Sequence, residues 1–538
     1  MKDAFVPLTR RAVFRAFGVA AAAVAGVLFA DHHAFAQART KMVIGTSADL
    51  VAFNPLVGNS RTDTWVTQLM YPRLMQITLE GRKEPQLATK WGYDSGGTTA
   101  RMTIRDDFRW SDGRPLTAED VAFTVNAIAK EKIGVVAGLI PAFVSAKAVS
   151  ATDVEFTLSR PDGTFLTNIG FWMPIVPAHV FSKADSVKTF ANDKDWVSAG
   201  PYKIARVDKG QRIVMERVEP YPFAPGGKPT LEQVEFRVFP DVNAQVLALR
   251  AGEIDVIANT IPPALARTLE TDRQIKLQKV PSLGWAHLQY NASRKPYDQP
   301  AVRQALAHAI NYEAIRRVVL QGQARSTGSS VLTPALPFWQ DPSLKEYAYD
   351  PKKARALLEA AGFKDDNKDN LYDGLSPTMI YDQADPYMAN AAQLVRDMSR
   401  EAGIDIKLSG LERNTYLAKT RERDFDIYAG SWSVMEDPPA YLGLAFRTGA
   451  FINYGQVSDP KLDSLIEQAQ KALSPDEAKP AVQEAARLIH REMYDNVLYV
   501  QDFFIAYNGA RWTGFVPQPS DLLSIVNPNS LASVRALN

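Results

Sequence analysis

The chain has 538 residues, and its 61 lysines and arginines balance 60 aspartates and glutamates to a formal net charge of +1. A charge so close to zero gives no basic surface for nucleic acid or anionic lipid, and we exclude both as partners. The sequence contains no cysteine, which excludes disulfides, thiol nucleophiles, cysteine-ligated metals and a lipid-modified amino-terminal cysteine. We expect a chain of this length to form two or three globular domains.

The first 36 residues differ in composition from the rest of the chain. A basic stretch from Thr9 to Arg15 precedes an alanine-rich apolar run from Ala16 to Ala30, and Ala34-Phe35-Ala36 follows before Gln37. This order is typical of a cleavable export signal. The paired Arg10-Arg11 resembles the twin-arginine type, although Val13 stands where that motif usually has phenylalanine. An amphipathic amino-terminal helix is the alternative, but no polar residue interrupts the apolar run.

The export signal predicts where the protein works. The apolar run is too short and too weakly hydrophobic to remain as a membrane span. We therefore expect residues 1–36 to be removed on export, which leaves a soluble, monomeric periplasmic protein without a lipid anchor or a membrane-inserted segment.

Helices and strands alternate along the remaining sequence. Thr117 to Asp120 is similar to a capping box, and apolar side chains on one face continue this helix to Ile128. Val154–Leu158 and Val234–Val238 alternate apolar with polar residues, which predicts half-buried strands. Further helices are predicted over 301–310, 350–361 and 461–472, and the stretch 246–257 predicts a helix that closes on 251–255. No internal repeat is visible, so we expect mixed α/β domains rather than a solenoid or a propeller.

Clusters of proline and glycine interrupt this pattern at 198–202, 221–230 and 280–284. Such clusters are typical of turns and loops. They mark candidate crossovers between lobes and divide the chain near residues 197 and 283.

Sequence motifs for catalysis are missing. There is no Gly-x-Ser-x-Gly elbow, no phosphate loop, no dinucleotide-binding glycine pattern and no zinc-binding HExxH. The four histidines after residue 36 are scattered, and a lone histidine is more often structural than a metal ligand. Asp365–Asp373 is similar to a calcium loop, but it lacks the glycine at the turn and the final bidentate glutamate. We therefore expect neither an enzyme nor a metal or cofactor site.

Three tryptophans fall in predicted loops: Trp65, Trp285 and Trp432. Their flat rings can cover apolar or sugar-like surfaces while the indole N–H donates a hydrogen bond. Core packing is the alternative for each of them. Trp285 with the nearby His287, and Trp432 with the adjacent Ser433, are therefore candidate ligand-binding residues.

A series of sequence blocks follows a fixed order along the chain. The blocks are Phe53–Leu56, Pro85–Trp91, Ile104–Gly113, Leu116–Val121, Gly200–Tyr202, Glu219–Tyr221, Val246–Ile257 and Val302–Asn311. In this order and spacing they resemble the extracellular solute-binding proteins of family 5, the dipeptide-, oligopeptide-, nickel- and opine-binding components of ABC importers. The resemblance covers nearly all of the chain after the first 36 residues.

The resemblance implies an α/β fold, a bilobal periplasmic binding protein of the large peptide-binding type. Lobe I would combine residues 37–75, 198–283 and 500–538, an extra inserted subdomain would span 76–197, and lobe II would span 284–499. The ligand would be enclosed between two lobes that close by a hinge motion. The closed form would deliver it to the membrane subunits of an ABC permease.

The resemblance also implies ligand contacts in the first lobe. In peptide-binding members, a loop shortly after the Phe-Asn-Pro block pairs with the backbone of the ligand. The corresponding residues here are Asn59, Ser60 and Arg61. An arginine at this position would favour an anionic group such as a carboxylate, unless its side chain is simply exposed on the surface.

The second lobe departs from the family pattern. Peptide-binding members neutralise the amino terminus of the peptide with an aspartate a few residues after a Gly-Trp pair, and that position falls on Val434 or Met435 here. A buried ammonium group without a carboxylate partner costs several kcal/mol. Glu436 is therefore the candidate replacement, with a solvent-facing loop acid as the alternative.

We expect the protein to bind a peptide or a peptide-like organic solute. Opines and short oligosaccharides are alternatives, because the aspartate is missing and tryptophans are available. An exported hydrolase of such solutes is an alternative from another class, although no nucleophile and base can be assigned to it. A chaperone-like binder of unfolded chains would need a large exposed apolar groove.

Overall fold

The computed structural model of the protein describes residues 39–58, 60–432 and 435–537. Thr40–Leu537 forms one compact unit, and all described helices and strands lie in it. The predicted export signal, residues 1–36, lies outside the described residues. Within the described part of the chain, no helix is both long enough and apolar enough to cross a membrane.

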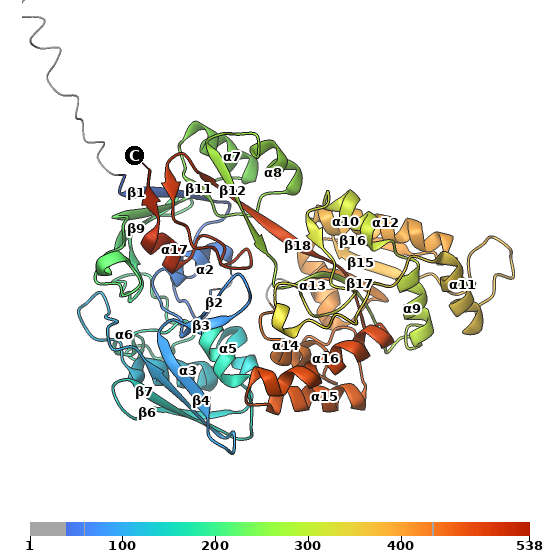
Figure 1. Cartoon of the computed structure of the whole chain (residues 1–538), viewed down its shortest axis with the longest axis horizontal. Helices are drawn as coiled ribbons and strands as arrows, with labels where there is room; N and C mark the ends of the chain where they lie inside the picture. Colours follow the sequence, from blue (N-terminus) through green and yellow to red (C-terminus); the bar gives the residue numbers. More distant parts are fainter. Residues whose placement is uncertain (1–38, 59, 433–434, 538) are drawn as a thin grey trace, which may run out of the picture. The chain divides into compact units, whose positions relative to one another are not determined.

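Strands and helices alternate as the sequence predicts (Figure 1). The strands are β1 (Lys41–Thr46), β2 (Met75–Ile77), β3 (Lys83–Pro85), β4 (Ala88–Tyr93), β5 (Thr99–Ile104), β6 (Phe143–Ala148), β7 (Asp153–Leu158), β8 (Tyr202–Asp208), β9 (Arg212–Arg217), β10 (Gln233–Val238), β11 (Val256–Ile257), β12 (Ile275–Pro281), β13 (Ala286–Tyr290), β14 (Ala324–Arg325), β15 (Thr378–Asp382), β16 (Lys407–Leu411), β17 (Ile427–Ser431), β18 (Asp495–Asn508), β19 (Trp512–Thr513) and β20 (Arg535–Ala536).

The helices lie between these strands, and many of them begin with proline in the first turn, where its missing N–H is not needed. They are α2 (Arg61–Gln68), α3 (Ala118–Glu131), α4 (Gly134–Leu139), α5 (Phe165–Trp172), α6 (Ala178–Phe181), α7 (Val242–Ala251), α8 (Pro263–Leu269), α9 (Pro300–His308), α10 (Tyr312–Val319), α11 (Pro351–Ala360), α12 (Pro386–Glu401), α13 (Arg413–Glu422), α14 (Pro438–Ala445), α15 (Pro460–Lys471), α16 (Pro475–Glu492) and α17 (Pro528–Ser533), with short 3-10 helices at Pro225–Gly227 and Pro337–Trp339.

Twelve of the described strands form one mixed sheet. Its order is β16-β15-β17-β13-β18-β11-β1-β10-β9-β8, and β12 and β14 also pair with β18. β1 is parallel to β10 and β11, and β15 is parallel to β16 and β17. β18 pairs with β13 near its start and with β12 along its second half. In Figure 1 this long red strand connects the amino-terminal strands with β13 and β17.

A second, antiparallel sheet has the order β4-β5-β7-β6, and α3 packs on β6 and β7. The predicted capping box at the start of α3 is confirmed: Thr117 and Asp120 accept each other's backbone N–H groups. The predicted apolar face of this helix, which runs to Ile128, is buried. This sheet and helix lie within the predicted inserted subdomain, 76–197.

Most of the other predicted elements are confirmed with small changes in their bounds. β7 and β10 form where the alternating segments predict strands, and α9, α11 and α15 form where helices are predicted. On the predicted polar face of β10, Gln233 and Arg237 are partly exposed, but Glu235 is fully buried. Its carboxylate forms ion pairs with Lys41 (2.7 Å) and Arg237 (2.8 Å), which offset the cost of burying its charge.

The helix predicted within 246–257 forms as α7 and closes within 251–255 as predicted, but it begins four residues earlier than predicted. α7 begins at Val242, because the side chain of Asp241 caps it, and it ends at Ala251. Gly252 then takes a left-handed conformation with φ of 73°, which suits glycine and ends the helix. The chain turns back into the main sheet as β11.

The loop prediction for Trp65 is also wrong. Trp65 lies in α2, and its side chain has no exposed surface. It belongs to the core rather than to a ligand-facing loop. Trp285 precedes β13 and Trp432 follows β17, and neither residue belongs to a helix or a strand, so the loop prediction is confirmed for both.

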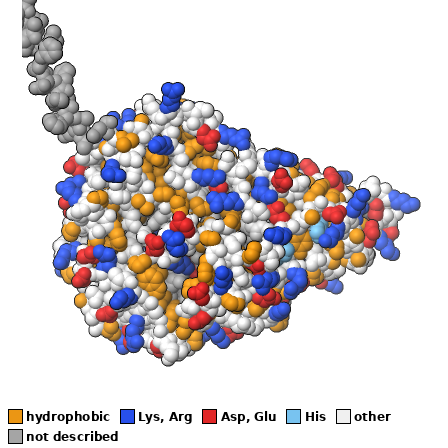
Figure 2. Space-filling model, viewed as in Figure 1, with side chains coloured by type: hydrophobic (Ala, Val, Ile, Leu, Met, Phe, Trp, Pro, Cys, Tyr) orange, Lys and Arg blue, Asp and Glu red, His pale blue; other side chains and the backbone are white. Residues whose placement is uncertain are grey.

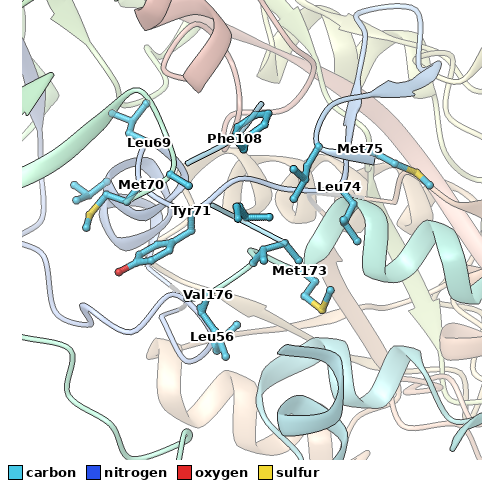
Figure 3. Close-up of a cluster of buried hydrophobic side chains, with 14 of the residues drawn as sticks. Leu56, Leu69, Met70, Tyr71, Leu74, Met75, Phe108, Met173 and Val176 are labelled. Atoms are coloured by element: carbon cyan, nitrogen blue, oxygen red, sulfur yellow. The ribbon is translucent and has the colours of Figure 1, made fainter. Parts of the chain in front are cut away.

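An apolar cluster at the carboxyl end of α2 fixes this part of the fold (Figure 3). It includes Leu56, Leu69, Met70, Tyr71, Leu74, Met75, Phe108, Met173 and Val176, and each of these side chains is at most 8% exposed. Full burial of one such side chain stabilises a fold by about 1.5–3 kcal/mol. The cluster therefore holds the chain around residues 55–75 against the segment 171–176.

Charged side chains of both signs are interspersed over the face shown in Figure 2, as the near-zero net charge predicts. The predicted boundary between residues 499 and 500 falls inside β18, so the main sheet continues across it. The predicted domain boundaries remain predictions.

Candidate ligand-binding site

A cavity of about 780 Å³ lies between segments that are far apart in the sequence. Its wall combines the loop before α2, helices α2 to α5, the region of α14 and the residues just after it, and residues 522–523. Among the described residues that line it, Arg73 alone is charged, and most of the others are apolar. The lining residues are Pro55, Leu56, Val57, Gly58, Thr64, Thr67, Gln68, Arg73, Ile128, Ile133, Gly134, Val136, Gly138, Leu139, Phe171, Trp172, Pro174, Leu444, Phe451, Ile452, Leu522 and Leu523.

Asn54 holds the loop that forms one side of the cavity. Its side-chain amide donates to the carbonyls of Val187 (2.8 Å) and Phe190 (3.0 Å). Its own side-chain and main-chain carbonyls accept the three N–H groups of residues 56–58. These N–H groups are therefore used within the protein, and the loop presents mainly its apolar side chains to the cavity.

Helix α2 begins with a second capping box. Ser60 Oγ accepts from the N–H of Asp63 (3.0 Å), and the Asp63 carboxylate accepts from the N–H of Ser60 (3.3 Å). Arg61 follows and forms an ion pair with Asp521, whose carboxylate is almost fully buried. Ser60 and Arg61 stabilise the start of the helix, and the part of α2 that lines the cavity begins one turn later, at Thr64.

The polar residues of the cavity wall direct their donors into the protein. The hydroxyl groups of Thr64 (3.0 Å) and Thr67 (2.6 Å) donate to carbonyls one turn earlier in α2. The side-chain amide of Gln68 donates to the carbonyl of Val526 (2.6 Å). Arg73 differs from these residues, because it donates no side-chain hydrogen bond to another described residue.

Arg73 lines the large, mostly apolar cavity and also a small neighbouring one, which is bordered by the amide side chains of Gln76, Gln86, Gln518 and Asn529. Its guanidinium carbon lies 5.5 Å from the centre of the Phe171 ring, which is a favourable cation–π distance. Burial lowers the pKa of Arg73 to about 10, and the negative charge of Glu436 opposes this effect. The guanidinium is still protonated at neutral pH, so the cavity holds a permanent positive charge.

A buried group of charges lies next to this wall. Trp172, which lines the cavity, donates its indole N–H to the carboxylate of Glu436. The ammonium of Lys83 lies 2.8 Å from the carboxylate of the neighbouring Asp437. These contacts connect α5 and β3 with the chain that leads into α14, so residues from both halves of the sequence meet behind Trp172.

Burial raises the pKa of Glu436 to about 7. The side chain is only 4% exposed, and desolvation penalises its charged form. Lys83 and the Trp172 N–H lower the pKa, and Asp437 raises it. Glu436 therefore changes its charge close to neutral pH.

Trp285, His287 and Trp432 lie together in a separate cluster. The Nδ1 atom of His287 is 2.8 Å from the carboxylate of Asp495, and both side chains are fully buried. The ring of Trp432 lies 5.6 Å from that of His287, and its backbone N–H donates to the carbonyl of Trp285. Buried ring nitrogens of all three residues have no hydrogen-bond partner among the described residues.

The predicted ligand-binding residues occupy different places in this arrangement. Asn59 and Ser433 lie outside the described residues. The others do not line the cavity: Ser60, Arg61, Trp285, His287, Trp432 and Glu436. Glu436 lies behind Trp172, one residue away from the cavity. Ligand contact by these residues remains a prediction.

The sequence reasoning missed Arg73 and Trp172. Arg73 does carry a signal, because it is a single arginine inside the apolar segment 69–77. Trp172 and the aliphatic wall carry none, since leucine, isoleucine and valine look the same in a sequence whether they fill a core or line a cavity.

Within the described residues, no group of three or more histidines, aspartates or glutamates is placed to hold a metal ion. Each described histidine instead contacts another group of the protein. His179 contacts Asp112 and His287 contacts Asp495, whereas His308 and His490 contact the backbone carbonyls of Ala348 and Lys345, respectively.

Comparison with known proteins gives relatives over nearly the whole chain. The chain is 26% identical over 506 residues to a protein of Escherichia coli K12 named "Probable D,D-dipeptide-binding periplasmic protein DdpA", covering 91% of this chain and 94% of that protein. It is also 26% identical over 386 residues to the nickel-binding periplasmic protein of the same strain, covering 70% of this chain and 72% of that protein.

The fold is that of a solved ABC transporter substrate-binding protein, CtaP from Listeria monocytogenes. The TM-score is 0.81 at 24% identity, and the match covers 93% of this chain and 100% of that one. This likeness confirms the predicted fold class, a bilobal α/β binding protein of the large type. Residues 83–453, more than half of the chain, match the model of the bacterial extracellular solute-binding proteins, family 5 Middle. The chain therefore belongs to family 5 of the bacterial extracellular solute-binding proteins.

Proposed function

We propose that this protein is the substrate-binding component of an ABC importer, which captures a peptide or peptide-like organic solute between two lobes and delivers it to a membrane permease. The cavity of about 780 Å³ carries this proposal. Its volume lies in the range of about 300–1,000 Å³ that is typical of sites for small organic ligands. A relative named as a D,D-dipeptide-binding protein supports a ligand of the peptide class.

The cellular setting belongs to the same proposal. Residues 1–36 act as an export signal, and the remaining chain works in the periplasm as a monomer without a lipid anchor. Lobe I (37–75, 198–283 and 500–538) and the inserted subdomain (76–197) face lobe II (284–499) across the ligand. Lys83 and Asp437, which form an ion pair, come from the two sides of this division.

The protein acts by binding rather than by catalysis. A receptor needs a different affinity for its ligand in its open and closed forms, and it needs no group that stabilises a transition state. An opine or a short oligosaccharide is an alternative ligand. An exported hydrolase of such solutes is the alternative from another class, and conversion of a bound ligand during incubation would support it.

The first test is to identify what the protein carries. The exported protein is purified without denaturation, its ligand is released with acid, and the released molecules are identified by mass spectrometry. Each candidate is then added back to stripped protein. A ligand present at about 100 times its Kd stabilises a protein by about 2.7 kcal/mol, which a thermal shift detects. If no released or screened solute raises the melting temperature, the proposed function is wrong.

The substitution Trp432→Ala tests the second cluster. The ring of Trp432 is half-buried and stacks on Tyr454, with ring centres 6.0 Å apart. A loss of ligand affinity with little change in the free energy of unfolding would place Trp432 at the ligand. A comparable loss of both would place it in the core.

A further inference from the structure

The hydrogen-bonding groups of the cavity wall are unequally available. The hydroxyl groups of Thr64 and Thr67 and the amide of Gln68 donate to backbone carbonyls. The indole of Trp172 donates to Glu436. Of the described side chains in the wall, Arg73 alone keeps a full set of donors for a ligand, and no aspartate or glutamate belongs to the wall.

We propose that the ligand is an amphiphilic monocarboxylate without a free amine, such as an amino-terminally acylated dipeptide, with its carboxylate on Arg73 and its apolar body along the cavity wall. This inference rests on the proposed function and specifies the chemical class of its ligand.

The carboxylate follows from the cost of leaving Arg73 alone. Arg73 is half-buried and donates no side-chain hydrogen bond to another described residue, so its guanidinium has lost part of its hydration. A ligand anion restores the lost interactions through two parallel N–H···O bonds. Phe171 covers one face of the guanidinium. The ligand must therefore approach along the edge of the guanidinium plane, where the N–H groups point.

We infer that the ligand has no free amine, because the nearby carboxylates already interact with other groups of the protein. Glu436 accepts from Trp172 and lies behind it, and Asp437 is paired with Lys83 at 2.8 Å. An ammonium group in the cavity would have no carboxylate of the described wall to neutralise it. An acylated nitrogen carries no charge, so it avoids this desolvation cost.

The apolar body follows from the rest of the wall. Side chains of Val57, Ile133, Val136, Leu444 and Ile452 border the cavity and come from three separate stretches of the chain. Burying apolar ligand surface against them contributes about 25 cal/mol per Å². A ligand that carries two side chains of the size of leucine can bury them against this surface.

Calorimetry on stripped, full-length exported protein tests the proposal with three probes. Two of them each differ from the first in a single group. The probes are N-acetyl-leucyl-leucine, leucyl-leucine with a free amine, and N-acetyl-leucyl-leucinamide, which has no carboxylate. We expect the acetylated acid to bind at least about tenfold more tightly than either of the others. The amide probe lacks the charge that accepts hydrogen bonds from Arg73, and the free dipeptide adds an ammonium group that has no partner in the cavity. Equal or tighter binding of the free amine or the amide, or no binding of all three probes, would overturn the proposal.

Variants of Arg73 test whether this residue causes the preference for the acid over the amide. Arg73→Gln should reduce the preference for the acid over the amide to less than about twofold, and Arg73→Lys should keep part of it. Arg105→Gln is the matched control, because Arg105 also lies over a phenylalanine ring, that of Phe223, and does not line the cavity. An unchanged preference in Arg73→Gln would contradict the assignment.

The ligand recovered by mass spectrometry separates this inference from the proposed function. A recovered peptide with a free amine that binds the Arg73→Gln variant as well as the wild type would refute the amphiphilic monocarboxylate and leave the importer function intact. A protein that binds no solute at all would refute both.

Discussion

Trp172 and Glu436 form a partly buried hydrogen bond between segments that are 264 residues apart in the chain. Trp172 ends α5 and lines the cavity, whereas Glu436 lies just before α14. The carboxylate is therefore one side chain away from the ligand. Because its pKa is close to neutral, its charge state links pH to both stability and binding.

The substitution Glu436→Gln should change how stability depends on pH. The pKa of Glu436 rises from 4.5 to about 7 on folding, so the wild type loses stability as pH increases from about 4.5 to about 7 and no further above that. Glutamine does not ionise, so the variant should gain about 2–3 kcal/mol relative to the wild type between pH 5 and pH 8. Urea unfolding of ligand-free protein measures this, with exposed Glu119→Gln as the control. Parallel pH profiles of Glu436→Gln and the wild type would contradict the raised pKa.

Binding of an anionic probe should strengthen as pH decreases from 8 to 6. Protonation of Glu436 removes a negative charge near Arg73, while Lys83 and Asp437 stay paired with each other. N-acetyl-leucyl-leucine should therefore bind more tightly at pH 6, by about threefold to tenfold. The neutral amide and the variant Glu436→Gln should show no such dependence. An affinity of the acid that is constant or increases with pH would exclude this coupling.

The substitution Arg61→Ala should lower stability and leave anion binding unchanged. It removes the cation that pairs with the buried carboxylate of Asp521. Since Arg61 is half exposed, the expected loss in the free energy of unfolding is about 1–3 kcal/mol, and Arg61→Lys should recover part of it. Denaturant unfolding and calorimetry measure the two effects. Weaker anion binding at unchanged stability would instead support the ligand contact predicted from the sequence.

The substitution Asn54→Ala should weaken both the fold and the site. It removes the side-chain bonds to Val187, Phe190 and the N–H of Leu56, and it leaves buried backbone groups unpaired. The expected loss in the free energy of unfolding is about 2–4 kcal/mol. Ligand affinity should also fall, because the loop then loses its fixed shape. Asn414→Ala, at an exposed position, is the control, and an effect no larger than that of the control would contradict this role for Asn54.

Local signals explain the elements that could be predicted from the sequence. The capping box at Thr117 and the proline after Asp350 act through neighbouring backbone groups, so their effect does not depend on the rest of the fold. Helix α2 shows the limit of this approach. Ser60 and Asp63 form the same kind of capping box, but the helix has few apolar residues, and its buried side chains are mostly polar.

The residues that line the cavity could not be predicted, because the lining depends on contacts between distant segments. Val57 and Leu444 look like ordinary core residues in the sequence, and only the tertiary structure places them around an empty volume. The family resemblance identified the class of protein and pointed to Glu436. It did not indicate that Trp172 would cover this carboxylate.

Strand β18 has a consequence for how the length of this chain can vary. Its first half places Val497 and Leu498 in two apolar clusters on opposite faces of the sheet, and its second half places Phe504 and Ile505 in two others. Deleting one residue near Gln501 would turn every later side chain of the strand to the wrong face. Insertions and deletions are therefore excluded from the middle of this strand, and only surface loops can change in length without unfolding one half of the molecule.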